Sequence, residues 1–281
     1  MSRIQVRVDG RTLTLSNLDK PMYPEFTKGE MIDYYTRIAP VLIPHLRDRP
    51  LTRVRFPEGV GALRFYEKNA PKGTPEWVRT ARIRTPGGQQ ESLDFVVVDD
   101  LPTLVWCANL AALELHVPQW RISTRKVDLM VFDLDPGAPA TFTEACVAGL
   151  LLRELLAADG FTAYPKSSGK KGLHLYVPVR DLDTSGYAKR AAERLEADYG
   201  RLITSRMERR LRTGKVFLDW SQNSLSKTTV APYSLRALDA PSVSTPLTWE
   251  EVEAGRTVRF GPEEVLERVG EHGDLMAPLL D

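Results

Sequence analysis

Two aspartates one residue apart end an apolar run at positions 131–135, Val-Phe-Asp-Leu-Asp. Alternate side chains of a strand share a face, so Asp133 and Asp135 should project together while Leu134 projects to the other side. Neighbouring carboxylates repel each other unless a cation neutralises them, and such oxygen ligands suit Mg²⁺ or Mn²⁺. The motif therefore predicts a metal site, although a solvated aspartate pair at the start of a loop explains this motif alone equally well.

A third acidic residue, Asp219, ends a second apolar run that starts at Val216. An aspartate in this place is commonly the first residue of a turn. If the two runs form neighbouring strands, Asp219 adds a third carboxylate to the same cations. We therefore expect Asp133, Asp135 and Asp219 to be metal ligands and catalytic residues of a metal-assisted phosphoryl transfer.

Between two strand-like runs lies a polar segment at 167–174, Ser-Ser-Gly-Lys-Lys-Gly-Leu-His. Its glycines allow close backbone approach, and Ser168, Lys170, Lys171 and His174 offer hydrogen-bond donors to phosphate. It is no Walker loop, because the spacing differs and a strand follows. A polar hairpin turn with exposed lysines is the alternative. Together with three carboxylates in the same half of the chain, the segment indicates phosphoryl transfer with paired metal ions.

Composition and charge set the remaining limits. The chain has 281 residues, 42% of them hydrophobic, two cysteines and a net charge of +1. Residues 201–236 hold eight basic and two acidic residues, whereas residues 237–281 hold three basic and ten acidic ones. This predicts a basic groove in a neutral protein, although a solvated basic helix face beside an acidic tail explains the charges alone. Because signal-peptide and membrane-spanning patterns are lacking, we expect a cytoplasmic protein.

The elements that position these residues follow from local patterns. Capping boxes at Thr27 and Thr141 predict helix starts, with the second helix ending near Gly160. Two strands should occupy 79–98 around a turn at 85–88. Further helices are expected at 104–113, 184–212 and from 262, and further strands at 126–135, 161–166, 173–179, 216–220 and 229–233. This pattern is mixed α/β with hairpins and differs from the alternating order of a parallel Rossmann sheet.

In their order along the chain, several motifs resemble the polymerase domain of bacterial ligase D, of the archaeo-eukaryotic primase superfamily. The matching stretches are 18–24, 27–30, 53–57, 133–137, 168–174, 231–236 and 244–246. The resemblance implies a primase-polymerase fold, in which an RRM-like antiparallel catalytic sheet packs against an N-terminal α/β unit. We expect one domain over 1–281, with a DNA-contacting part at 1–115, a catalytic part at 116–281, and no fused ligase or nuclease.

The resemblance also implies roles for individual residues. The three aspartates would bind two divalent cations, Mn²⁺ or Mg²⁺. The incoming nucleotide would be contacted by His116, Ser168, Lys171, His174, Gln222, Lys227 and Arg236. Some relatives have arginine at the position of Gln222. His116 would lie near the sugar, where it could distinguish a 2′-hydroxyl; the alternative is a buried histidine with satisfied hydrogen bonds.

Residues of the first part would contact DNA. Lys20 and Lys28 resemble lysines that hold a downstream 5′-phosphate. Phe65 and Tyr66 would stack on template bases, with tyrosine in place of the commoner second phenylalanine; the alternative is that both aromatics belong to the core. We expect two further contacts with the template backbone, from Arg53 and Arg55.

The expected function is that of a template-dependent nucleotidyltransferase, a DNA/RNA polymerase that adds nucleotides, preferably ribonucleotides, at short gaps or broken ends. It would serve DNA repair, either end joining or gap filling in excision repair. Expected partners are gapped or broken DNA, NTP or dNTP, Ku and a separate ATP-dependent DNA ligase, with the protein acting as a nucleoid-associated monomer. The alternatives are a non-catalytic module that binds DNA ends and, less well supported, a two-metal phosphoesterase.

Overall fold

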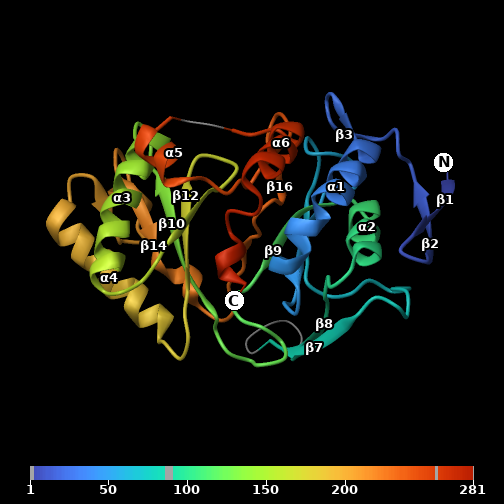
Figure 1. Cartoon of the computed structure of the whole chain (residues 1–281), viewed down its shortest axis with the longest axis horizontal. Helices are drawn as coiled ribbons and strands as arrows, with labels where there is room; N and C mark the ends of the chain where they lie inside the picture. The colour runs from blue at the N-terminus through green and yellow to red at the C-terminus, as the bar shows by residue number, and fades with distance from the viewer. Residues whose placement is uncertain (1–2, 86–90, 257–258, 281) are drawn as a thin grey trace.

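Two sheets organise the computed structural model, which describes residues 3–85, 91–256 and 259–280. One has five strands in the order β11-β12-β10-β14-β13, and the other has four in the order β15-β9-β5-β6. Figure 1 shows the five-stranded sheet beside α3 and α4 in one half of the molecule, with α1 and α2 in the other half. The expected mixed α+β fold is confirmed.

The five-stranded sheet contains both aspartate runs. Its strands are β10 (Leu129–Pro136), β11 (Tyr164–Ser167), β12 (Leu173–Pro178), β13 (Ile203–Thr204) and β14 (Val216–Asp219). All pairs are antiparallel except β13 with β14. Two helices, α3 (Phe142–Ala158) and α4 (Thr184–Tyr199), pack on the same side of this sheet (Figure 1). At Gly149 the approach of α3 is so close that a β-carbon would lie 2.5 Å from the Leu173 side chain.

The four-stranded sheet carries four of the expected DNA-contacting residues, Arg53, Arg55, Phe65 and Tyr66. It consists of β5 (Thr52–Arg55), β6 (Phe65–Glu67), β9 (Ala112–Val117) and β15 (Thr229–Val230) and lies near α1 (Lys28–Leu46) and α2 (Leu101–Asn109). The capping box at the start of α1 is confirmed: Glu30 N donates to Thr27 Oγ1 at 3.2 Å, and Thr27 N donates to Glu30 Oε2 at 2.7 Å. Because these bonds satisfy amides that lack helical partners, the sequence defines this helix start.

Short hairpins and helices complete the fold. The remaining strands are β1 (Arg3–Val8), β2 (Arg11–Ser16), β3 (Pro21–Tyr23), β4 (Phe26–Thr27), β7 (Thr80–Arg84), β8 (Ser92–Val96), β16 (Leu235–Arg236) and β17 (Ser242–Val243). The helices α5 (Trp249–Ala254) and α6 (Pro262–His272) follow, with single 3₁₀ turns η1 (Arg209–Leu211), η2 (Trp220–Asn223) and η3 (Ala277–Leu279). No helix of the described ranges is long and apolar enough to cross a membrane.

The segment after β14 connects the two halves. Val230 of β15 pairs with His116 of β9, and Leu115 N donates to Ser234 Oγ at 2.9 Å. Tyr34 of α1 donates its hydroxyl to Tyr233 O at 2.8 Å. The expected boundary between the two parts, at 115/116, therefore lies inside β9, and β15 from the later part pairs with this strand. One hydrophobic cluster includes residues from both parts.

Three expected elements differ from the observed ones. The helix expected at 184–212 ends at Tyr199, after which the chain turns into β13. The helix expected at 104–113 ends at Asn109, and the apolar residues that follow form β9, because short apolar runs fit a buried strand as well as a helix. The strand expected at 229–233 is reduced to β15. The turn expected between β7 and β8 falls largely on residues 86–88, outside the described ranges.

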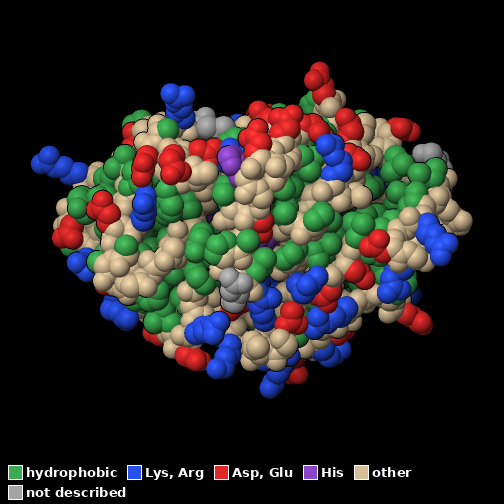
Figure 2. Space-filling model, viewed as in Figure 1, with side chains coloured by type: hydrophobic (Ala, Val, Ile, Leu, Met, Phe, Trp, Pro, Cys, Tyr) green, Lys and Arg blue, Asp and Glu red, His purple; other side chains and the backbone are tan. Residues whose placement is uncertain are grey.

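Acidic and basic side chains gather in different places on one face of the molecule. Helices α5 and α6 each have two acidic residues in the first turn. Figure 2 shows acidic side chains gathered over these helices, whereas basic side chains lie along the opposite edge of the same face.

Candidate active site

The three expected metal ligands lie on one face of the five-stranded sheet. Asp133 is the direct cross-strand partner of Asp219, so their β-carbons are about 5 Å apart. Asp135, two residues along β10, shares their face, and the intervening Leu134 is buried on the side of α3. The long-range pairing of β10 with β14 therefore brings together the carboxylates that the sequence places 84 to 86 positions apart.

The carboxylate oxygens face donors of the chain itself. Asp219 Oδ1 accepts from Ser221 N at 2.9 Å, and its Oδ2 accepts from Gln222 Nε2 at 3.0 Å. Asp133 Oδ1 lies 3.3 Å from His174 Nε2. Among the described residues, no three acidic, histidine or cysteine side chains already converge as a set of metal ligands.

The electrostatics of the three carboxylates favour a cation. Burial, followed by the charge of Asp133, raises the pKa of Asp135 to about 6, and Asp219 adds to the shift. Burial also acts to raise the pKa of Asp133, but His174, Lys166 and Arg236 together outweigh it and the net shift is downward. The neighbouring carboxylates of Asp133 and Asp135 repel each other, and their oxygen ligands match the chemistry of Mg²⁺ and Mn²⁺.

The polar segment at 167–174 comprises the end of β11, the connecting loop at 168–172 and the start of β12, and it contacts Arg236. Ser168 Oγ accepts from Lys170 N at 3.2 Å and from Gly172 N at 3.0 Å. Arg236 Nη1 donates to Ser168 O at 2.7 Å. Gly169 has a φ of +72°, and a β-carbon there would lie 2.5 Å from Arg236 Cγ. The loop and Arg236 are therefore packed into one basic unit.

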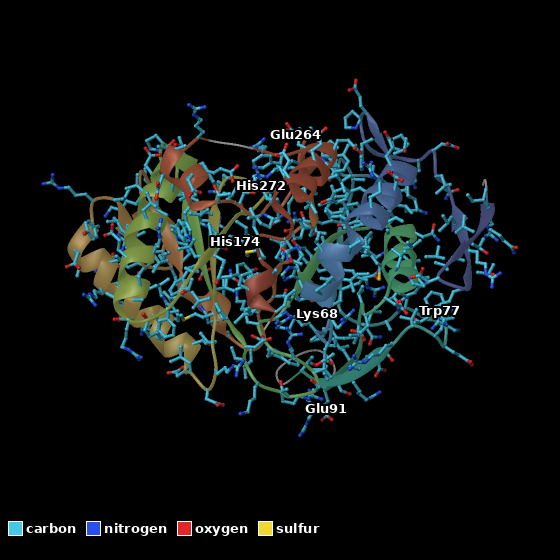
Figure 3. All side chains as sticks on the ribbon, in the orientation of Figure 1. Lys68, Trp77, Glu91, His174, Glu264 and His272 are labelled. Carbon is cyan, nitrogen blue, oxygen red and sulfur yellow. The ribbon has the colours of Figure 1, made fainter. Side chains whose placement is uncertain are left out.

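A pocket of about 500 Å³ opens beside this unit. Eight of the expected site residues line it: His116, Asp133, Asp135, Ser168, Lys171, His174, Gln222 and Arg236. Lys171 Nζ donates to Pro136 O at 2.8 Å, next to the aspartate pair. Lys227 is exposed and adjoins the lining residue Thr228. Figure 3 shows His174 near the centre of the molecule, between its two halves.

Lys166, a buried lysine that contacts the pocket residue His174, was not predicted from the sequence. Its Nζ lies 3.1 Å from His174 Nδ1 and donates to Ser244 Oγ at 2.6 Å. Burial lowers the pKa of Lys166 well below its usual value. Lys166 is the cross-strand partner of His174 in the hairpin of β11 and β12, so the register of that hairpin could have indicated this contact.

Glu114 was also missed, although it stands two residues before His116 on β9. Its Oε2 lies 2.9 Å from His116 Nε2, and its Oε1 accepts from Ala237 N at 3.0 Å and lies 3.3 Å from Arg236 Nε. A spacing of two on a strand places both side chains on one face, which is the signal in the sequence. Lys170 and Arg259 add two more basic side chains to the pocket wall.

The two lysines expected at a 5′-phosphate lie near each other. Lys20 pairs with Glu58 at 2.7 Å, whereas Lys28 is buried and donates from Nζ to Ser16 O at 2.6 Å. Burial lowers the pKa of Lys28 to about 8, and the positive charges of Lys20 and Arg55 contribute to the shift. Since these like charges repel, a bound anion would relieve their repulsion.

The remaining expected DNA contacts differ in exposure. Phe65 and Tyr66 on β6 are 49% and 60% exposed, so they are not core residues. Arg55 is partly buried and pairs with Glu67 at 2.5 Å. Arg53 has no exposed side-chain surface and donates to Asn69 O at 2.7 Å. The expected template contact of Arg53 is therefore withdrawn, because its guanidinium is enclosed by the protein.

Paired carboxylates on a mixed sheet, facing a basic loop across a pocket, define a nucleotidyltransferase of the primase-polymerase class. The sequence model of the family described as LigD, primase-polymerase domain, matches residues 27–276. The chain belongs to this family.

Similar proteins agree with this assignment. The chain is 42% identical over 274 residues to the multifunctional non-homologous end joining protein LigD of Mycolicibacterium smegmatis, covering 94% of this chain and 36% of that protein. It is 32% identical to the bifunctional non-homologous end joining protein LigD of Bacillus subtilis, covering 93% of this chain and 43% of that protein. The chain thus spans well under half of these relatives. The structure of the polymerase domain of Mycobacterium tuberculosis ligase D in complex with DNA matches with a TM-score of 0.89 and 40% identity, over 95% of this chain and 98% of that one.

Proposed function

We propose that this protein extends primer 3′ ends on a template at short gaps and broken DNA ends, with a preference for ribonucleotides and for a downstream 5′-phosphate. The pairing of Asp133 with Asp219, next to Asp135 and the 167–174 loop, carries the proposal, since it unites possible metal ligands with phosphate donors. The relatives' names refer to non-homologous end joining, and one relative is known in complex with DNA.

We propose that Asp133, Asp135 and Asp219 hold two divalent cations, Mn²⁺ or Mg²⁺. Bound there, such ions would lower the pKa of the primer 3′-hydroxyl and neutralise the triphosphate and the leaving pyrophosphate. The raised pKa of Asp135 supports this assignment because a nearby cation would favour the ionised carboxylate against both causes of the shift, its burial and the repulsion by Asp133.

The incoming triphosphate would occupy the basic pocket. Ser168 fixes the loop through its two accepted hydrogen bonds, so the amides and Lys171 are oriented before the nucleotide arrives. Arg236 and His174 lie on the same wall, and Gln222 and Lys227 would reach the nucleotide from the segment after β14. Such preorganised donors stabilise charge without reorganising during the reaction.

DNA would bind along the four-stranded sheet. Phe65 and Tyr66 would stack on template bases, because both rings are exposed on an edge strand. The Arg64 guanidinium lies over the Tyr66 ring, 5.4 Å from its centroid. Lys20 and Lys28 would hold the 5′-phosphate across the gap, and Arg55 would contact the template backbone. We expect the sugar of the nucleotide to lie near His116.

In the cell, we propose that the protein acts as a monomer on nucleoid DNA in the cytoplasm, in end joining. Nucleotide addition leaves a nick, so a DNA ligase must complete the repair. Ku and an ATP-dependent ligase are the proposed partners.

Primer extension on gapped duplexes tests the proposal. The assay compares 5′-phosphate with 5′-hydroxyl gaps, rNTP with dNTP, and Mn²⁺ with Mg²⁺. We expect template-directed addition that requires a divalent ion and is fastest with ribonucleotides at phosphorylated gaps. DNA binding without any extension would instead support the non-catalytic end-binding module, and cleavage of DNA would support the phosphoesterase.

A further inference from the structure

Glu114 is a buried carboxylate beside a pocket that we assign to a polyanion. Its side chain is 5% exposed. A negative charge here repels a triphosphate and weakens its binding. A carboxylate in this place therefore points to another role. None of the steps proposed above uses it.

Glu114 contacts three residues that line the pocket, His116, Arg236 and Lys170. Its Oε2 lies 2.9 Å from His116 Nε2, on the sugar side. Its Oε1 lies 3.3 Å from Arg236 Nε and 3.7 Å from Lys170 Nζ, on the phosphate side. Ala237 N also donates to Oε1, at 3.0 Å. The carboxylate is therefore held in place from several directions.

These contacts determine which nitrogen of His116 carries the proton. Burial acts to raise the pKa of Glu114, but the hydrogen bond from His116 and the charge of Arg236 outweigh it, so the pKa is lowered and the group is ionised. Burial lowers the pKa of His116, so its ring is neutral. An ionised carboxylate can only accept a hydrogen bond. The single ring proton of His116 is therefore on Nε2, and Nδ1 is an acceptor.

The imidazole ring of His116, which carries the acceptor Nδ1, belongs to a residue that lines the pocket. No residue within the described ranges donates to Nδ1. The main chain of His116 is fixed by its pairing with Val230 and Thr52 in the four-stranded sheet. The ring is thus anchored at one nitrogen and can accept a hydrogen bond from a bound molecule at the other.

We propose that Glu114 is a positioning residue for sugar selection: by keeping the proton of His116 on Nε2, it presents Nδ1 as an acceptor for the 2′-hydroxyl of an incoming ribonucleotide. The inference rests on the proposed nucleotide addition. A deoxynucleotide has no 2′ donor and leaves Nδ1 unpaired, so a site built for this bond discriminates against it.

The first experiment uses the unaltered protein and compares kcat/KM for ribo-, 2′-fluoro- and 2′-deoxynucleotides in primer extension. Fluorine at the 2′ position can accept a hydrogen bond weakly but cannot donate one. We expect the ribonucleotide to exceed both analogues by about three- to tenfold, the size of one net hydrogen bond. Equal use of 2′-fluoro- and ribonucleotides would overturn the proposal, because it would show that a 2′ donor is not required.

The second experiment repeats the comparison with Glu114→Gln and His116→Ala. A glutamine can donate to Nε2, which allows the proton to move to Nδ1, so the preference for ribo- over 2′-fluoronucleotide should fall toward one. His116→Ala should abolish the same preference. In the control Glu251→Gln, whose carboxylate pairs with Arg268 on the remote helices α5 and α6, the preference should remain.

The outcomes separate this inference from the function on which it rests. If the unaltered protein adds no nucleotide, both the proposed function and the selection mechanism fail. If it adds nucleotides but Glu114→Gln lowers kcat/KM equally for all three sugars, Glu114 is merely structural and only the inference fails. Thermal unfolding checks that the variant is folded; if it is not, the 2′-fluoro comparison with the unaltered protein decides.

Discussion

The nucleotide pocket and the DNA-contacting surface are built on different principles. In the pocket, polar side chains are buried and hold one another, as in the series Lys166, His174 and Asp133. On the DNA-contacting surface, Phe65 and Tyr66 project from an edge strand with half or more of their surface free. The pocket is therefore organised before its ligand arrives, whereas the surface offers separate contacts.

This difference determines how each region responds to substitution. In a buried polar network, removal of one member leaves its partners unsatisfied, so effects are large and interdependent. Exposed contacts act nearly independently and are screened by salt when charged. We therefore expect losses of catalysis in the pocket and graded losses of affinity on the surface.

The largest effect is expected from Asp133→Asn. Loss of one possible metal ligand should lower the rate of primer extension by about 10³-fold or more, since metal ions contribute several kcal/mol to such reactions. DNA affinity, measured by fluorescence anisotropy, should change little. Asp198→Asn on the exposed face of α4 is the matched control. A normal extension rate in Asp133→Asn would contradict the expected difference between the nucleotide pocket and the DNA-contacting surface.

A smaller loss is expected from Lys166→Met, which leaves His174 Nδ1 without its donor. We expect kcat/KM for the nucleotide to fall about 10- to 100-fold, as for residues that orient the ligands of metal sites. Steady-state kinetics should show the loss, and Lys126→Met, at an exposed lysine paired with Asp181, should not. A lower melting temperature with unchanged kinetics would mean that Lys166 only stabilises the fold.

On the DNA-contacting surface, Phe65→Ala should weaken template binding by about 1–3 kcal/mol, the contribution of one stacked base. Saturating DNA should restore most of the extension rate, because the pocket is intact. The control is Tyr199→Ala, at a tyrosine of α4 with similar exposure. Loss of rate that excess DNA does not restore would show that the aromatic acts on the chemistry.

The smallest effect is expected at the 5′-phosphate. Lys28→Ala should weaken binding to phosphorylated gaps by a few-fold and leave 5′-hydroxyl gaps unaffected. Because a lysine is charged below its pKa and that of Lys28 is about 8, the advantage of the phosphate should decline from pH 7 to pH 9. Binding assays with both gap types measure this directly. An equal loss on 5′-hydroxyl gaps would make Lys28 a general backbone contact.

Local patterns predicted the features that depend on neighbours in sequence. The shared face of Asp133 and Asp135 follows from strand periodicity, and the starts of α1 and α3 follow from capping boxes whose bonds span three residues. The 167–174 loop was recognisable because its glycines and donors are consecutive.

Features that depend on tertiary contacts were not predictable in this way. The partnership of Asp219 with Asp133 requires the register of two distant strands, and it was only one of the alternatives for Asp219. Arg53 was expected to contact the template backbone because its motif resembles that of the family, but its side chain is buried and donates to Asn69 O. The roles of Lys166 and Glu114 depend on partners brought together by hairpin and sheet pairing.

The central claim is that β10 and β14 jointly supply the ligands of the catalytic cations. Titration of Mn²⁺ into the protein, with free ion followed by electron paramagnetic resonance, tests it without relying on activity. We expect Asp219→Asn, on a strand separate from the Asp133 and Asp135 pair, to abolish tight Mn²⁺ binding as completely as Asp133→Asn does. Unchanged Mn²⁺ binding by Asp219→Asn would contradict the claim.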